Sequence, residues 1–121
     1  MTNYKDLDVW KISMVVVKEV YLLTKKFPQD ELYGLTSQCR RAAVSIIANI
    51  AEGMGRQYKK DTLQFLHISR GSVYEIDALL NAALVTEIIN EEDFKNVAPL
   101  IEKCIRVLNG FINYNQKAEL K

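Results

Sequence analysis

The run Arg40–Arg56, which reads RRAAVSIIANIAEGMGR, decides the fold of this chain. Apolar residues recur along it at helical spacing, so the pattern predicts an amphipathic helix. A glycine-rich loop binds phosphate when it leads into a helix N-terminus, whereas Gly53-Met54-Gly55 follows a helix. Glycine often terminates helices because it accepts the left-handed conformation, and we therefore predict that Gly53-Met54-Gly55 ends this one. The core stripe of the helix would consist of Cys39, Ala43 (or Ala42), Ile46 and Ile50.

The same helical period predicts three further helices, over roughly residues 7–27, 61–84 and 91–112. Asp6 or Asp8 is the expected N-cap of the first helix, and Pro28 limits its C-terminal end. Thr36 is the expected N-cap of the second helix, and Asn90, followed by three acids, that of the fourth.

The connections between these helices are short, and no segment shows the alternation of a strand. Short connections favour antiparallel packing of helices that are neighbours along the chain. The sequence therefore predicts an all-α fold, an up-down-up-down antiparallel four-helix bundle that forms one domain over residues 1–121. Pro99 falls inside the fourth helix, either in a late first turn or at a kink.

Composition and charge set bounds on the partners of this chain. Its 16 basic and 15 acidic residues leave a net charge of +1, so any nucleic-acid partner must be bound by a local patch. Cys39 and Cys104 each lie on an apolar stripe, which favours buried reduced thiols over a disulfide. The N-terminal segment lacks the apolar core of a signal peptide, and no apolar run approaches membrane-spanning length. We therefore expect a cytoplasmic protein without a membrane partner.

The polar residues of the second helix are expected to face the third. If the two helices form a hairpin that turns near Gln57-Tyr58, facing positions have numbers that sum to about 115. This register predicts an ion pair between Arg41 and Glu75, and a close approach of the backbones at Gly71. We interpret the polar set as a structural network, favoured over a catalytic constellation. The network would comprise Arg41, Ser45, Asn49, Glu52, Ser72 and Glu75.

Signatures of catalysis are sparse. The single histidine, His67, lies on the predicted outer face of the third helix and has no ligand partner at metal-binding spacing. The chain contains neither a Walker motif nor a nucleophile elbow, and the helical carboxylate–histidine signature of di-iron bundles is also absent. We therefore expect no enzyme activity, no cofactor and no metal site.

Basic residues gather at one end of the predicted bundle. The loop between the second and third helices would lie beside both termini, and aromatic residues at Tyr4 and Tyr58 are placed to stack on bases. This arrangement suggests a modest nucleic-acid footprint, although a plain solvated bundle end explains the same pattern. The candidate nucleic-acid-binding residues are Arg56, Lys59, Lys60 and Lys117, with Lys5 and Lys121 nearby.

Several of these segments, taken together, resemble one family. The motifs are Phe27-Pro28, Glu31-x-Tyr33-Gly34-Leu35-Thr36-Ser37-Gln38, Arg40-Arg41-Ala42-Ala43-x-Ser45-Ile46, Asn49-Ile50-Ala51-Glu52-Gly53 and Phe65-Leu66-x-Ile68-x-x-Gly71-Ser72-x-x-Glu75. They are similar to those of the bacterial 23S rRNA intervening-sequence proteins, and the accessory variability proteins of diversity-generating retroelements are similar too. Two positions depart from the family pattern, because Ile47 stands where proline is frequent and Ser69 where alanine is frequent.

The resemblance implies a four-helix bundle that assembles into a homo-oligomer, in particular a pentameric ring. Such an assembly would explain a second apolar row on the first helix, and exposed aromatic residues such as Tyr33. That row consists of Trp10, Met14, Val17 and Tyr21. For the retroelement relatives, the resemblance also implies binding of nucleic acid and of a reverse transcriptase.

These observations lead to two hypotheses of function. In the first, the chain is a non-catalytic homo-oligomer that binds structured RNA or another nucleic acid through its basic end, where repetition around a ring multiplies the charge. In the alternative, the oligomer is a scaffold for a protein partner, for example a reverse transcriptase, and has no direct role with nucleic acid.

Overall fold

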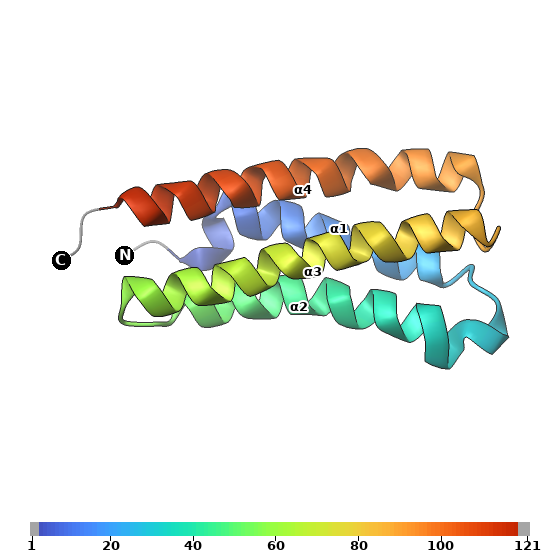
Figure 1. Ribbon diagram of the computed structural model, residues 1–121, viewed down its shortest axis with the longest axis horizontal. Helices are drawn as coiled ribbons and strands as arrows, with labels where there is room; N and C mark the ends of the chain where they lie inside the picture. Colours follow the sequence, from blue (N-terminus) through green and yellow to red (C-terminus); the bar gives the residue numbers. More distant parts are fainter. Residues whose placement is uncertain (1–2, 119–121) are drawn as a thin grey trace.

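The regular structure of this protein is helical throughout the part described by the computed structural model, residues 3–118 (Figure 1). The four long helices are α1 (Asp8–Thr24), α2 (Ser37–Met54), α3 (Lys59–Val85) and α4 (Glu91–Lys117). A short 3₁₀ turn, Tyr4–Asp6, precedes α1. A second one, Gln29–Glu31, and a π-helical turn, Leu32–Thr36, lead into α2.

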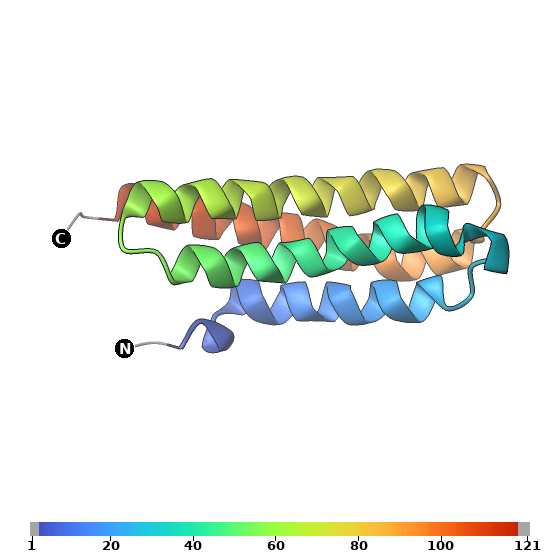
Figure 2. The ribbon, with the colours of Figure 1, turned by 90° about the horizontal axis from the view of Figure 1, so that it is seen from below.

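The helices run alternately up and down, so the predicted antiparallel four-helix bundle is confirmed (Figure 1). Each helix packs on its neighbours along the chain, and α1 also packs on α4, which closes the bundle. Figure 2 shows α2 between α1 and α3. Both ends of the described chain lie at the same end of the bundle as the α2–α3 loop (Figure 1).

The core is built from the apolar stripes that the helical period predicts. The α1 stripe from Val9 to Phe27 is buried, and α2 contributes Ile46 and Ile50, which are fully buried. Burial of such side chains is the main favourable term in folding, about 25 cal/mol per Å² of apolar surface. Cys39 and Cys104 are free thiols within this core, as expected. None of the helices within residues 3–118 has an apolar segment long enough to cross a membrane.

The run Gly53-Met54-Gly55 ends α2, as predicted, but without a left-handed glycine. The C-cap residue, Gly55, has φ −88° and ψ −2°, and no glycine of the described chain has a positive φ. The helix therefore ends where it was predicted to end, with Gly55 as its C-cap residue, and only the expected left-handed conformation is wrong. Gly53 is buried against α3, where an added Cβ would lie 3.1 Å from the Cβ of Phe65. The hydroxyl of Thr62 donates a hydrogen bond to the carbonyl of Gly53 at 2.8 Å.

The predicted close approach of backbones at Gly71 is also wrong. Gly71 is exposed, and an added Cβ there would meet no atom within 4 Å. The two helices keep the expected register, but the glycine that packs against the facing helix is Gly53, at one end of the hairpin. The helical period locates the stripe that faces α2 only to within a neighbouring position, and Gly71 falls just outside it.

Two of the predicted helix caps differ from the structure. The N-cap residue of α1 is Leu7, which makes no capping side-chain bond, and Asn3 caps the preceding 3₁₀ turn instead. Thr36 does occupy the N-cap position of α2, but it is buried in right-handed helical conformation and its side chain makes no cap bond, because the π-helical turn runs directly into α2. In that turn the carboxylate of Glu31 accepts the N–H of Leu35 at 3.1 Å.

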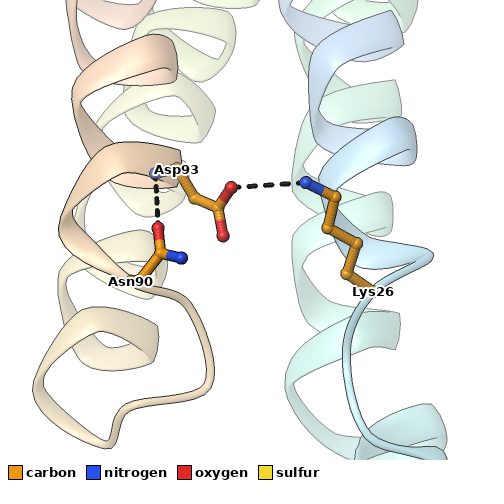
Figure 3. A network of polar contacts seen from close by, with 3 residues as sticks. All are labelled: Lys26, Asn90 and Asp93. Carbon is orange, nitrogen blue, oxygen red and sulfur yellow. Dashed lines mark hydrogen bonds and ion pairs between the residues drawn. The ribbon is translucent and has the colours of Figure 1, made fainter.

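The predicted cap of α4 is confirmed. The side-chain oxygen of Asn90 accepts the N–H of Asp93 at 2.7 Å, and the Asp93 carboxylate pairs with Lys26 at 3.3 Å (Figure 3). This pair ties the start of α4 to the end of α1. Pro99 lies about two turns beyond Glu91 inside a continuous helix, so a position in the first turn is ruled out.

Candidate nucleic-acid interface

A small polar cluster joins α2 to α3 near the middle of the hairpin. The hydroxyl of Ser72 donates to that of Ser45 at 2.8 Å, and the Asn49 amide donates to the carbonyl and hydroxyl oxygens of Ser45 at 2.8 and 3.0 Å. The structure thus brings together three of the six residues expected in the polar network. These bonds satisfy the cluster internally and fix the axial alignment of the two helices.

A further interhelical bond lies beside this cluster. The buried hydroxyl of Ser69 donates to the carbonyl oxygen of Ile46 at 2.7 Å. Sequence reasoning noted Ser69 only as a departure from a family pattern, although its number and that of Ile46 sum to 115. The pairs Ser69–Ile46 and Thr62–Gly53 both match the predicted register.

The other three residues of the expected network are placed elsewhere. Arg41 and Glu75 are exposed, and the ion pairs of residues 3–118 do not include one between them. Glu52 pairs with Arg56, one helical turn further along the chain, at 2.8 Å. Exposed carboxylates remain hydrated and gain little from a distant partner, which explains why Arg41 and Glu75 stay apart.

The polar groups inside the bundle are paired with one another or with the backbone. Every buried side-chain nitrogen or oxygen of the described residues has a hydrogen-bond partner. Within the same range, no group of three His, Cys, Asp or Glu residues is placed to hold a metal ion. His67 is exposed on the outer face, as predicted, and its Nδ1 lies 2.9 Å from the guanidinium of Arg70. Arg70 in turn donates to Asn109 on α4 at 3.0 Å.

One lysine of the predicted basic end has a structural role. The ammonium of Lys59 donates to the carbonyl oxygens of Gln116 and Ala118, at 2.6 and 2.9 Å. The last carbonyls of a helix have no partner within the helix, so Lys59 caps the C-terminus of α4. This contact joins residues 57 positions apart in the chain, and local sequence patterns carry no signal for it.

The other basic residues at this end differ in whether their side chains already form an ion pair. Arg56 pairs with Glu52, and its guanidinium carbon lies 4.6 Å from the centre of the Phe65 ring. Lys60 and Lys117 are exposed and take part in none of the ion pairs of residues 3–118. Lys121 lies outside the described residues. The available positive charge is therefore carried by Lys60 and Lys117, together with Lys5, which is exposed and also takes part in none of the ion pairs of residues 3–118.

An apolar concavity lies beside these cations on the outer face of α3. It encloses about 890 Å³ and has a mainly apolar lining, with Leu63 at its base and Ile68 exposed at 45%. Sequence reasoning missed it, although apolar residues on the outer row of α3 are a signal for such a surface. Its lining includes Tyr58, Lys60, Leu63, Gln64, His67 and Ile68.

These features define a class, a small closed four-helix bundle with an interhelical serine–asparagine cluster and a partly basic end. The chain belongs to the 23S rRNA-intervening sequence protein family, whose sequence model matches residues 5–110. Its fold is similar to the crystal structure of a protein of unknown function from the S23 ribosomal protein family of Bacteroides thetaiotaomicron VPI-5482. The TM-score is 0.79 at 23% identity, over 86% of this chain and 97% of that one, a likeness that shows the fold. No curated protein gives a significant match.

Proposed function

We propose that this chain is a non-catalytic, homo-oligomeric binding protein that contacts structured RNA through its basic end, in the cytoplasm. The observation that carries the proposal is the meeting of Lys60, after the α2–α3 loop, and Lys117, at the end of α4, on one end of the bundle (Figure 1). Both ammonium groups are exposed, and Tyr58 lies beside Lys60 at 64% exposure. Exposed cations with an adjacent aromatic ring suit a phosphate backbone. The family's name points to 23S rRNA as the RNA to test.

The proposal includes self-association, because two cations bind phosphate weakly. The outer face of α1 carries exposed apolar side chains, among them Met14 and Val15, each at 40%. Burying this face between copies, for example in a ring of five, would bring several basic ends together. Linked weak contacts then act with a high effective concentration and strengthen binding, although each single contact stays the same.

The alternative function, a scaffold for a protein partner such as a reverse transcriptase, is favoured by one observation. The concavity beside Lys60 is lined mainly by apolar atoms, including those of Leu63 and Ile68. An apolar surface rimmed by cations suits an amphipathic segment of another protein better than it suits a phosphate backbone.

Titration of a labelled 23S rRNA fragment, followed by fluorescence anisotropy over a range of salt concentrations, tests the RNA proposal. Replacement of Lys60 and Lys117 by alanine should lower the salt slope by about 0.9 for each phosphate that is no longer neutralised. The matched control, Lys95→Ala with Lys103→Ala, removes the same charge from exposed positions on α4. Binding without salt dependence, or an equal weakening in the control, contradicts the proposal.

A second measurement separates the two functions. Ile68→Glu places a charge in the apolar concavity but leaves Lys60 and Lys117 intact. RNA affinity should persist in this variant if the cations bind the backbone. A protein partner whose recovery survives nuclease treatment and is abolished by Ile68→Glu would support the scaffold function.

A further inference from the structure

A second concavity lies at the opposite end of the bundle, in the outer groove between α1 and α2. It encloses about 450 Å³, a size suited to a small ligand, and its lining combines tyrosine and arginine side chains. The residues that matter for its chemistry are Tyr21, Tyr33, Arg40 and Arg41. Among the described residues, no carboxylate belongs to this lining.

Arg40 is held rigidly in this groove. Its Nε donates to the hydroxyl of Thr24 at 2.9 Å, and its guanidinium carbon lies 4.9 Å from the centre of the Tyr21 ring. Thr24 is itself buried and oriented by donating to the carbonyl of Val20 at 2.8 Å. Two independent contacts, one at Nε and one across the flat face, therefore fix the orientation of the guanidinium.

The outer nitrogens of Arg40 have no protein partner. Within residues 3–118, neither Nη atom of this half-buried side chain makes a hydrogen bond, and no carboxylate pairs with it. The nearby Glu31 directs its carboxylate to the N–H of Leu35 instead. Partly buried charges are normally paired, and a fixed guanidinium presents two parallel N–H donors that match phosphate or carboxylate oxygens. The geometry calls for an anion at this position.

Two exposed neighbours of Arg40 indicate which kind of molecule carries the anionic group. Arg41 follows Arg40 on α2, is exposed, and also lacks an ion pair within the described chain. Tyr33 is 94% exposed on the π-helical turn and lines the same groove. An isolated carboxylate would satisfy Arg40 but leave this ring uncovered. A phosphate attached to an aromatic base satisfies the cations and covers the ring together.

We propose that this groove binds a nucleotide unit, with its phosphate on Arg40 and Arg41 and its base against Tyr33. The unit is either a free nucleotide or one residue of a single-stranded nucleic acid. The groove lies at the far end of the bundle from Lys60 and Lys117 (Figure 1), so the proposal stands whether or not the basic end binds RNA.

The test uses the full-length Lys60→Ala, Lys117→Ala protein, which removes the contribution of the basic end. Uridine monophosphate is titrated by calorimetry, and a short labelled single-stranded RNA by anisotropy. Tyr33→Ala should weaken binding roughly tenfold, the scale of one base–aromatic stack. Arg41→Ala should weaken RNA binding and lower its salt slope by about 0.7. Arg40→Lys keeps the positive charge but removes the paired N–H donors of the guanidinium, so it should weaken binding of whichever probe the groove binds. Unchanged thermal stability of this variant is the check on folding.

The controls are Tyr74→Ala and Lys95→Ala, which remove an exposed ring and an exposed charge elsewhere. Binding of the mononucleotide identifies a free nucleotide as the ligand, and binding of the RNA alone identifies a strand. If neither binds, or if the three groove variants bind as tightly as their parent, the proposal is overturned. It is equally overturned if a glutamate-rich peptide binds the groove and neither nucleotide probe does, since the anion would then be a protein carboxylate.

Discussion

At the scale of single residues, Gly53 is packed so tightly that an added methyl group would require a small shift of α3. A Cβ at this position would lie 3.1 Å from the Cβ of Phe65 and 3.2 Å from the carbonyl oxygen of Thr62. Because that oxygen belongs to the backbone of α3, the clash cannot be relieved by turning a side chain. Gly53→Ala should therefore lower the free energy of unfolding by about 1–3 kcal/mol, the usual cost of overpacking. Urea denaturation measures this change.

Gly71→Ala is the matched control for that experiment. Gly71 is an exposed residue in the interior of α3, and an added methyl group would meet open space. Alanine is favoured over glycine in a helix by about 0.5–1 kcal/mol, so this variant should be more stable than the natural protein. Equal effects of the two substitutions would contradict the packing argument.

Cys39 makes the stability of the protein depend on alkaline pH. Burial, and secondarily the charge of Glu75, raises the pKa of the Cys39 thiol from 9.0 to about 11. The folded state thus keeps a proton that the unfolded state releases, and the stabilisation is complete below pH 9 and is lost as the pH rises towards 11. The free energy of unfolding should fall more steeply across this window in the natural protein than in Cys39→Ala. Parallel curves would contradict the assignment.

At this scale the sequence predicted part of the polar contacts. The contact between Ser45 and Ser72 could be predicted, because the position of the turn between α2 and α3 implies that the numbers of facing residues sum to about 115. The ion pair between Arg41 and Glu75 was expected from the same register and does not form. Register fixes the height of a residue along the hairpin, but whether its side chain meets a partner depends on its angle around the helix, which the pattern resolves less well.

At the scale of helices, Lys59 links the start of α3 to the end of α4. Its ammonium donates to two carbonyls of the last turn, where the negative end of the helix dipole also favours a cation. Lys59→Ala should speed amide hydrogen exchange in the last turns of α4 and cost about 0.3–1 kcal/mol of stability. Lys60→Ala is the control, since Lys60 is exposed and makes no such contact within residues 3–118. Equal protection in both variants would rule out the capping role.

The helices themselves were predictable, and their ends less so. Burial repeats at helical spacing over many turns, which makes each of the four stripes a strong signal. Caps rest on single residues, and Thr36 illustrates the weakness. It has the side chain of an N-cap, but the π-helical turn before α2 already satisfies the first turn. Contacts such as that of Lys59 come from tertiary proximity and leave no local pattern.

At the scale of the whole molecule, the exposed apolar face of α1 predicts self-association. Light scattering should give a mass several times the 13.9 kDa of the chain. Met14→Glu combined with Val15→Glu should shift the mass towards the monomer, because burying two unpaired carboxylates in an interface is costly. Lys95→Glu, an exposed position on α4 away from this face, should leave the mass unchanged. A monomeric natural protein would refute the interface.

The family could be inferred at this scale because its motifs are spread along the chain from Phe27 to Glu75, and the family match over residues 5–110 confirms it. The groove at Arg40 could not be inferred from the sequence, because its four side chains come from α1, a turn and α2, and meet only in the folded bundle. No spacing within one helix indicates that Tyr21 and Thr24 fix Arg40 from a neighbouring helix.

The order of the helices also bears on how quickly the protein folds. Every helix packs on the helix that follows it, and among the main helix pairs of the described chain it is the contact between α1 and α4 that joins distant segments. Small helical proteins with mostly local contacts fold within microseconds to milliseconds. The α2–α3 hairpin, with its short loop and its bonds at Gly53, Ile46 and Ser45, is the segment with the least loop entropy to overcome. We therefore expect this hairpin to form first and the docking of α1 on α4 to complete the core.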